Sequence, residues 1–120
     1  MIIGGGPGGL STARAYREAG GRARVTLLSA EPYPPYQRPL LTKEYLRGEM
    51  GRDDLPIEVP RWYGKNGVKL QLAMRVESLD TERAIVETER GEIRYDACVL
   101  ATGSEPMRLP VPGADDPEIL

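Results

Sequence analysis

The sequence has no histidine and a single cysteine, Cys98, among its 120 residues. Without histidine, neither a Ser-His-Asp nor a Cys-His hydrolase site can be built from these residues. A single cysteine excludes an internal disulfide and every paired-cysteine redox or zinc motif, so we predict no metal site. Cys98 itself is expected to be a small buried hydrophobe. If the chain belongs to an enzyme, a bound cofactor must supply most of the chemistry.

The sequence also lacks a strong excess of charge and a long apolar run. Its net charge is −2, with both signs mixed along the chain, so no field attracts nucleic acid or an anionic membrane. The longest apolar run, Ala97 to Ala101, is far shorter than the ~20 residues that cross a bilayer. No basic segment followed by an apolar one precedes the first predicted strand, so we expect a cytoplasmic location. The apolar content of 40% suits one globular domain.

What the chain does contain is a strand–loop–helix–strand pattern at its start. Met1 to Ile3 is typical of the end of a buried parallel strand. Leu10 to Ala19 predicts a helix that ends at the glycine pair beginning with Gly20. Ala23 to Ser29 has the β-branched and aliphatic residues of a second buried strand. The pattern predicts a Rossmann-like α/β fold with a parallel sheet.

The loop between the first strand and the helix has the GxGxxG spacing. Gly4 allows the tight turn off the strand, Gly6 lets a pyrophosphate approach bare backbone, and Gly9 lets the helix pack close to the sheet. Glu31, 22 residues after Gly9, is the acid expected to accept hydrogen bonds from ribose hydroxyls. The predicted phosphate-binding residues are Gly4, Gly5, Gly6, Pro7, Gly8 and Gly9. The fingerprint fits NAD and FAD equally, and a glycine-rich turn without a ligand is the alternative.

The middle of the chain is rich in proline. Glu31 to Pro39 must be an extended loop, because the residue before a proline is displaced from the helical region. Leu41 to Gly48 is predicted to form a short helix with Thr42 as its N-cap. A helical turn around Trp62, ending at Gly67, is expected to follow.

From Val68 onward the hydrophobic period changes to two. The pattern predicts a small antiparallel meander whose turns fall at residues 80–82 and 89–91, with Val68 to Leu72 in its first strand. Ala97 to Thr102 is an apolar strand that ends at Gly103. The predicted division is a βαβ unit over 1–30, a proline-rich loop and short helix over 31–66, the meander and last strand over 67–103, and a linker over 104–120.

Three stretches resemble a known family. PYQRPLLTKEYLRGE (35–49) is similar to the PYxRPPLSK motif of the FAD-dependent pyridine nucleotide-disulfide oxidoreductases, with Leu40 in place of a proline and Thr42 in place of a serine. WYGKNGVKLQLAMRVESLD (62–80) and YDACVLATGSEPMRLPVPG (95–113) extend the resemblance over nearly the whole chain. The branch resembled is that of the ferredoxin, rubredoxin and putidaredoxin reductases, to which apoptosis-inducing factor is similar.

The resemblance implies that the glycine loop binds the pyrophosphate of FAD. By the same resemblance, Arg38 and Lys43 reach the flavin side, and Lys43 is the candidate catalytic residue because its charge would polarise the ring. Val76 would hold the adenine through its backbone, and Ala101, Thr102 and Gly103 would approach the cofactor closely. Without the family, Arg38 and Lys43 would be interpreted as surface cations and Val76 as a core residue.

Two departures from the family pattern affect individual sites. Ala30 stands where the family often has an acid, and Met107, followed by Arg108, stands where the branch usually has an arginine. Arg108 is therefore only a secondary candidate for a cofactor contact. The missing cysteine pair argues against the branch that resembles glutathione reductase.

The family's subunits are several times longer than this chain, so the resemblance implies an incomplete N-terminal part. The domain for NAD(P)H would lie outside it, and the parent enzyme would pass electrons from nicotinamide through FAD to an iron–sulfur protein. The chain alone is expected to bind FAD weakly, if at all, without turnover, and its sheet is expected to have an unpaired edge. The alternatives are a non-catalytic FAD module like apoptosis-inducing factor and a plain NAD-binding Rossmann domain.

Overall fold

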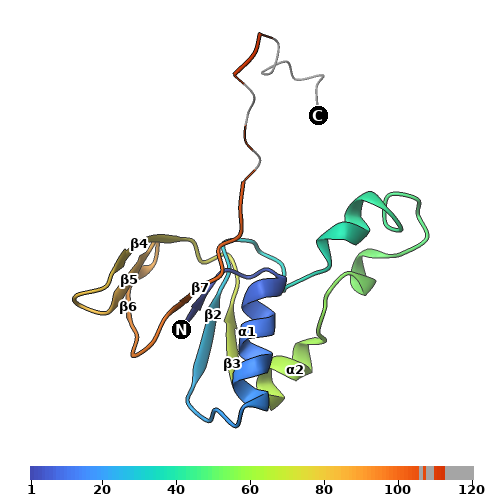
Figure 1. Ribbon diagram of the computed structural model, residues 1–120. Helices are drawn as coiled ribbons and strands as arrows, with labels where there is room; N and C mark the ends of the chain where they lie inside the picture. Colours follow the sequence, from blue (N-terminus) through green and yellow to red (C-terminus); the bar gives the residue numbers. More distant parts are fainter. Residues whose placement is uncertain (106, 108–109, 113–120) are drawn as a thin grey trace.

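The computed structural model describes residues 1–105, 107 and 110–112, which form two sheets and two α-helices (Figure 1). The first sheet is parallel, in the order β3-β2-β1-β7. Its strands are β1 (Ile2–Ile3), β2 (Val25–Leu28), β3 (Val68–Gln71) and β7 (Val99–Leu100). The antiparallel second sheet consists of β4 (Val76–Asp80), β5 (Ile85–Thr88) and β6 (Gly91–Arg94). The predicted fold class is confirmed.

The helices cover one face of the parallel sheet. Side chains alternate between the two faces of a strand, so Val25 and Leu27 of β2 point to the same side. There they pack with Leu10 of α1 (Pro7–Glu18) and Tyr63 of α2 (Pro60–Lys65) in a buried cluster. The three-stranded sheet covers the opposite face, where Ile3, Leu28, Met74 and Val86 form the second buried cluster. The parallel sheet is therefore the middle layer of the molecule.

Helix α1 begins earlier than the sequence pattern predicts. It starts at Pro7, whose fixed φ suits the first helical position, and not at Leu10. It ends at Glu18, and Gly20 and Gly21 donate backbone hydrogen bonds to the carbonyls of Arg17 and Tyr16, as expected for a glycine-terminated helix. Gly8 and Gly9 thus lie in the first turn of the helix and not in the loop before it.

Strand β3 belongs to the parallel sheet, so its predicted place in the antiparallel meander is wrong. Helix α2 ends at Lys65, Gly67 turns with φ +60°, and the chain returns parallel to β2, with Val68 beside Val25. A period of two shows only that alternate side chains are buried. The choice of partner strand depends on the crossover through α2, which carries the chain back to the end where β2 began. The helical turn at Trp62 and the remaining meander over 76–94 are confirmed.

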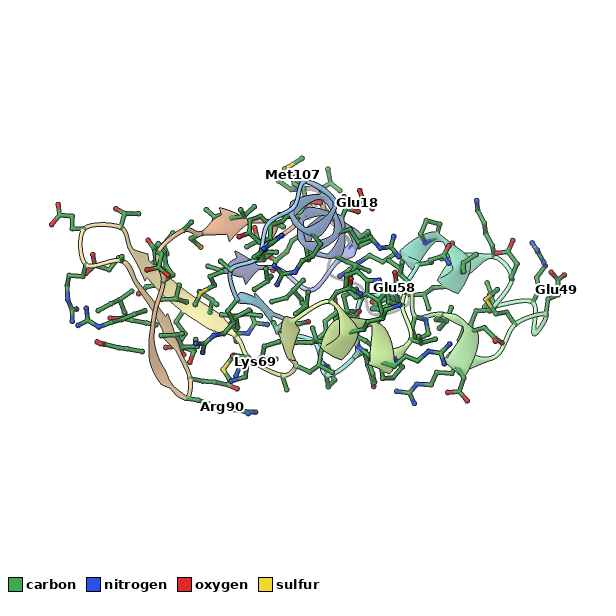
Figure 2. The ribbon with its side chains drawn as sticks, turned by 90° about the horizontal axis from the view of Figure 1, so that it is seen from below. Glu18, Glu49, Glu58, Lys69, Arg90 and Met107 are labelled. Atoms are coloured by element: carbon green, nitrogen blue, oxygen red, sulfur yellow. The ribbon has the colours of Figure 1, made fainter. Side chains whose placement is uncertain are left out.

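Residues 38–54 form an arm that projects from the body. It contains two 3₁₀ turns, η1 (Arg38–Thr42) and η2 (Arg52–Asp54). Figures 1 and 2 show the arm, with Glu49 near its tip, and the three-stranded sheet, with Arg90, on opposite sides of the parallel sheet. The predicted helix over Leu41–Gly48 is wrong, since residues 43–48 are turns. The predicted N-cap is wrong too, because the Thr42 hydroxyl donates to the Pro39 carbonyl at 3.5 Å and caps no N–H.

Strand β7 forms one edge of the parallel sheet. Among the described residues it pairs only with β1, and Leu100 is 62% exposed. The strand predicted over 97–102 is therefore limited to Val99–Leu100 and is more exposed than predicted. Cys98 is half-buried, and burial raises the pKa of its thiol above the usual value. Of the predicted linker, residues 106, 108–109 and 113–120, Arg108 among them, lie outside the described residues. No helix in the described part is both long and apolar enough to span a membrane.

Candidate functional site

The glycine loop connects the carboxyl end of β1 to the amino end of α1. Gly4 has φ +123°, and its N–H donates to the Leu28 carbonyl at 2.9 Å. A Cβ on Gly4 would lie 2.0 Å from the Ala101 carbonyl oxygen, a distance that no side chain can accept. Glycine is therefore required at this position by both conformation and space.

Two other glycines of the loop are also required by packing. A Cβ on Gly9 would lie 2.0 Å from the carbonyl oxygen of Gly4, which confirms the close approach of helix and strand. A Cβ on Gly5 would lie 2.2 Å from the hydroxyl of Ser29, a buried residue directly after β2. The internal structure of the fold thus accounts for these residues without any ligand.

Gly6 differs from its neighbours. Its φ of −87° and ψ of −175° are open to any residue, and nothing described lies within 4 Å of the place that a Cβ would take. Neither conformation nor packing explains a glycine here. A bare backbone that faces open space is what a closely approaching ligand requires.

The amino end of α1 adds a positive potential at the same place. Gly6 is the N-cap and offers no side chain, Pro7 occupies the first turn, and that turn contains no acidic residue. The first N–H groups of a helix have no carbonyl partner within it, and the helix dipole places a partial positive charge there. The loop therefore suits a phosphate group and has no carboxylate of its own in that turn.

An open groove of ≈ 810 Å³ lies at this end of the parallel sheet. We call it the carboxyl-end groove, because the residues that follow β1, β2 and β7 line it. Figure 1 shows the ends of these strands side by side at this edge of the sheet. All of the predicted cofactor-binding residues except Gly9 and Lys43 line this groove: Gly4, Gly5, Gly6, Pro7, Gly8, Glu31, Arg38, Val76, Ala101, Thr102 and Gly103. The fold thus gathers segments that are far apart in sequence around the glycine loop.

The two predicted cofactor-binding residues that do not line the groove have different surroundings. Gly9 is buried under Gly4, so it shapes the loop and does not face the groove. Lys43 follows η1 on the arm and is exposed. Its N–H donates to the Leu40 carbonyl at 3.2 Å, a contact within the arm itself.

Glu31 and Arg38, predicted to contact different parts of the cofactor, contact each other. Arg38 Nη2 donates to Glu31 Oε1 at 2.5 Å, and the Tyr36 hydroxyl donates to Glu31 Oε2 at 2.9 Å. Arg38 also lies over the Tyr36 ring, 5.4 Å from its centre. Burial, followed by the hydrogen bond to Glu31, raises the pKa of the Tyr36 phenol, so this group stays a donor at neutral pH.

Val76 and the segment after β7 form the remaining walls. Val76 begins β4, directly before an irregularity in its pairing with β5. The Ala101 N–H donates to the Ile3 carbonyl at 2.7 Å, which fixes the end of β7 beside the glycine loop. Gly103 has φ +79°, a conformation that turns the chain away from the sheet.

Sequence reasoning did not identify three residues of this site. Ser29 accepts a hydrogen bond from the Glu31 N–H at 3.2 Å, Tyr36 holds the Glu31 carboxylate, and Arg75 adds a cation to the groove. A serine directly after a buried strand is a weak local signal for the first. Tyr36 and Arg75 have no such signal, because their positions depend on how distant segments fold together. Among the described residues, no cluster of His, Cys, Asp or Glu could hold a metal.

The sequence matches the family described as pyridine nucleotide-disulphide oxidoreductase over residues 1–119. It is 33% identical over 116 residues to a rubredoxin-NAD(+) reductase of Pseudomonas putida, covering 96% of this chain and 30% of that protein. It is 35% identical to a rhodocoxin reductase of Rhodococcus erythropolis, covering 99% of this chain and 28% of that protein. The chain therefore spans less than a third of the length of these relatives.

Solved structures agree with these matches. The ferredoxin reductase for the CYP199A2 system from Rhodopseudomonas palustris superimposes with a TM-score of 0.89 at 32% identity, covering 99% of this chain and 30% of that one. The NADH:rubredoxin oxidoreductase from Clostridium acetobutylicum gives a TM-score of 0.81 at 34% identity, covering 96% of this chain and 30% of that one. The fold and the arrangement of segments around the groove are thus shared with these reductases.

Proposed function

We propose that this chain, which belongs to the pyridine nucleotide-disulphide oxidoreductase family, is the FAD-binding part of a reductase that takes electrons from NAD(P)H. We further propose an iron–sulfur protein as the electron acceptor and the cytoplasm as the location. The names of the relatives support the acceptor class, because they are reductases for rubredoxin and similar proteins. These names do not favour a non-catalytic module or a plain NAD-binding domain.

The observation that carries the proposal is the contrast among the glycines of the loop. Gly4, Gly5 and Gly9 are required by the fold, whereas Gly6 presents bare backbone to open space within the groove. The pyrophosphate of FAD fits this place, since its charge matches the amino end of α1 and its bulk needs the space that a Cβ on Gly6 would fill. The groove volume of ≈ 810 Å³ falls within the range of about 300–1,000 Å³ that is usual for ligand pockets.

The other groove residues have proposed roles along the same ligand. Glu31 accepts hydrogen bonds from the adenosine ribose, and the backbone at Val76 holds the adenine. Arg38 adds a positive charge beside the dinucleotide, and Gly103 with its two preceding residues lets the chain approach closely. The resemblance assigns Lys43 to the flavin side, but the arm holds it outside the groove, so we assign it no step.

The chain supplies binding and orientation. When bound, FAD supplies the redox chemistry, in which a hydride arrives from reduced nicotinamide and electrons leave singly. Hydride transfer needs stacking and orientation more than an acid or a base, so the absence of histidine is compatible with it. The contacts to nicotinamide and to the acceptor are proposed to lie outside this chain, which spans less than a third of its relatives.

The test is a set of separate titrations of the purified chain with FAD, NADH and riboflavin, in which fluorescence measures binding. We expect weak but saturable binding of FAD, competition by ADP, and no binding of riboflavin, which lacks the pyrophosphate. NADH should bind more weakly than FAD and should not reduce the flavin. Tighter binding of NADH would indicate a plain NAD-binding domain, and the absence of saturable binding of either dinucleotide would contradict the proposal.

A further inference from the structure

The carboxylate of Glu31 is held by two side chains that approach it from different directions. Arg38 donates to one oxygen at 2.5 Å, and Tyr36 donates to the other at 2.9 Å. A carboxylate has about four acceptor positions, so each oxygen still has one that is free for a further donor. Glu31 also lines the carboxyl-end groove. The two contacts therefore fix the orientation of the carboxylate and leave acceptor positions for a ligand.

We infer that Tyr36 is a positioning residue for the ribose of the bound dinucleotide, acting by holding the Glu31 carboxylate in a fixed orientation. The inference rests on the proposed function, since it takes Glu31 as the ribose acceptor. Tyr36 itself does not line the groove, whereas Glu31 and Arg38 do. Any effect of its hydroxyl on the ligand must therefore pass through Glu31.

The backbone around Tyr36 is held firmly enough for this role. Tyr36 forms an antiparallel bridge with Pro56. On either side of it, the Gln37 N–H donates to the Leu55 carbonyl at 3.0 Å and the Ile57 N–H donates to the Pro35 carbonyl at 2.9 Å. Pro35 is fully buried, as is most of Leu55. The phenol is thus presented by a paired, anchored segment, although the local sequence predicts an extended loop.

The backbone of Glu31 is fixed as well. Its N–H donates to the Ser29 hydroxyl at 3.2 Å, and its carbonyl accepts from the Ala73 N–H at 3.0 Å. With both ends of the residue anchored, the remaining freedom is rotation of the side chain. Tyr36 and Arg38 restrict this rotation, because they donate hydrogen bonds to different oxygens of the carboxylate. Arg38 alone would hold it less well, because its side chain is 56% exposed.

The experiment compares two ligands on the 120-residue chain. One is FAD, and the other is an FAD analogue with 2′,3′-dideoxyadenosine in place of adenosine, which lacks the ribose hydroxyls. For Tyr36→Phe we expect Kd for FAD to rise about fivefold, since one hydrogen bond to a charged group is lost. Kd for the dideoxy analogue should stay within about 1.5-fold of the unmodified chain, because no ribose donor is left for Glu31 to accept from.

Tyr33→Phe is the matched control. Tyr33 belongs to the same proline-rich segment, but its ring lies under Arg52 and it does not line the groove. Its substitution should change neither affinity. A second variant, Glu31→Ala, tests the route of the effect, because it removes the acceptor of the Tyr36 hydroxyl: in that background, adding Tyr36→Phe should cause no further loss of FAD affinity.

Each outcome decides between distinct interpretations. Equal losses for both ligands would show that Tyr36 only supports the fold, and an unchanged FAD affinity would show that the hydrogen bond has no role in binding. A further loss in the Glu31→Ala background would also overturn the inference. If the unmodified chain binds neither ligand, the proposed function fails, and this inference fails with it. If it binds FAD while Tyr36→Phe has no selective effect, only the inference fails.

Discussion

Two grooves of nearly equal volume, ≈ 810 and ≈ 780 Å³, adjoin the parallel sheet, and they differ in what lines them. The carboxyl-end groove is lined by the glycine loop and the segments that follow β1, β2 and β7. The second, which we call the amino-end groove, is lined by residues at the opposite ends of these strands, including Met1, Arg24 and Ala97. The amino-end groove has side chains where the carboxyl-end groove has bare backbone.

The comparison shows that volume alone does not identify the site. At the carboxyl end, free N–H groups and the positive end of α1 converge on open space, because the strands are parallel and α1 runs antiparallel to them, so that its amino end lies beside their carboxyl ends. At the amino end, the groove contains the exposed cations Arg24 and Lys69, whose charges are screened by water and salt. Substitutions in the two regions are therefore expected to separate effects on stability from effects on FAD binding.

The largest effect is expected for Gly9→Ala. The new Cβ would overlap the carbonyl oxygen of Gly4, so α1 would have to move off the sheet. We expect a loss of more than about 4 kcal/mol in the free energy of unfolding, measured by urea denaturation. Gly8→Ala is the matched control, because in the described part of the chain its Cβ would meet only the Ala101 side chain, at 3.9 Å. Equal stability of the two variants would contradict the proposed packing of helix and strand.

The next effect is expected for Arg17→Met, beside the amino-end groove. Arg17 donates to the backbone carbonyls of Asn66, Gly21, Ala23 and Gly67 at 2.6 to 3.0 Å, which joins the end of α1 to the turns before β2 and β3. The loss of these bonds should lower the free energy of unfolding by about 2–4 kcal/mol. FAD affinity, measured under conditions where the variant is folded, should change less than twofold. A large loss of affinity would contradict the separation of the two regions.

A moderate effect on binding is expected from a matched pair of charge substitutions. Arg38→Gln removes a cation and the ion pair with Glu31 in the carboxyl-end groove. Its Kd for FAD should rise about fivefold to tenfold, and less at high salt because Arg38 is largely exposed. Lys69→Gln removes a cation from the amino-end groove and should leave Kd unchanged. Fluorescence titration at two salt concentrations measures both, and similar losses would indicate only a general effect of charge.

The smallest effect is expected for Tyr63→Phe, on the side of α2 that packs against the sheet and away from both grooves. Tyr63 is 5% exposed, and its hydroxyl has no hydrogen-bond partner in the described part of the chain. Removing the hydroxyl should leave the free energy of unfolding unchanged or raise it by about 1 kcal/mol. Urea denaturation measures this value, and a loss of stability would show that the hydroxyl has a partner.

The same variant, Tyr63→Phe, tests how the stability of the fold depends on pH. Burial first, and then the charge of Glu58, raises the pKa of Tyr63 to about 12, compared with 10.0 for a free tyrosine. Because the folded value lies above the unfolded one, the associated stability is complete below pH 10 and is lost as the pH rises toward 12. Near-ultraviolet absorbance should show a tyrosine that titrates near pH 12 and is missing in Tyr63→Phe. If all tyrosines titrate together, the buried position of this phenol is wrong.

The elements that sequence predicted well are those decided by local residues. The glycines after β1 and the capping glycine after α1 fix a backbone that few other residues allow, so their pattern predicted β1, α1 and β2. The predicted helix over residues 41–48 failed because Tyr45 and Leu46 are exposed, at 41% and 74%, so the segment buries no apolar face. A short helix without such packing is marginal in water.

The geometry of the candidate site could also be predicted where local residues decide the structure, and could not where distant segments do. The glycine loop could be predicted, because its steric requirements fall on residues that are close together in the sequence. The contact of Glu31 with Arg38 and Tyr36 could not, because it forms only when the proline-rich segment pairs with Leu55 to Ile57. The place of β3 in the parallel sheet likewise depends on the crossover through α2.

The central claim, that Gly6 is a glycine because a pyrophosphate approaches it, is tested most directly by measuring both FAD affinity and stability in Gly6→Ala. A Cβ at Gly6 meets no described atom within 4 Å, so the free energy of unfolding should change by less than about 1 kcal/mol, while Kd for FAD should rise more than about tenfold. Gly64→Ala, at an equally open position in α2, is the control and should not affect FAD binding. An unchanged FAD affinity in folded Gly6→Ala would contradict the account.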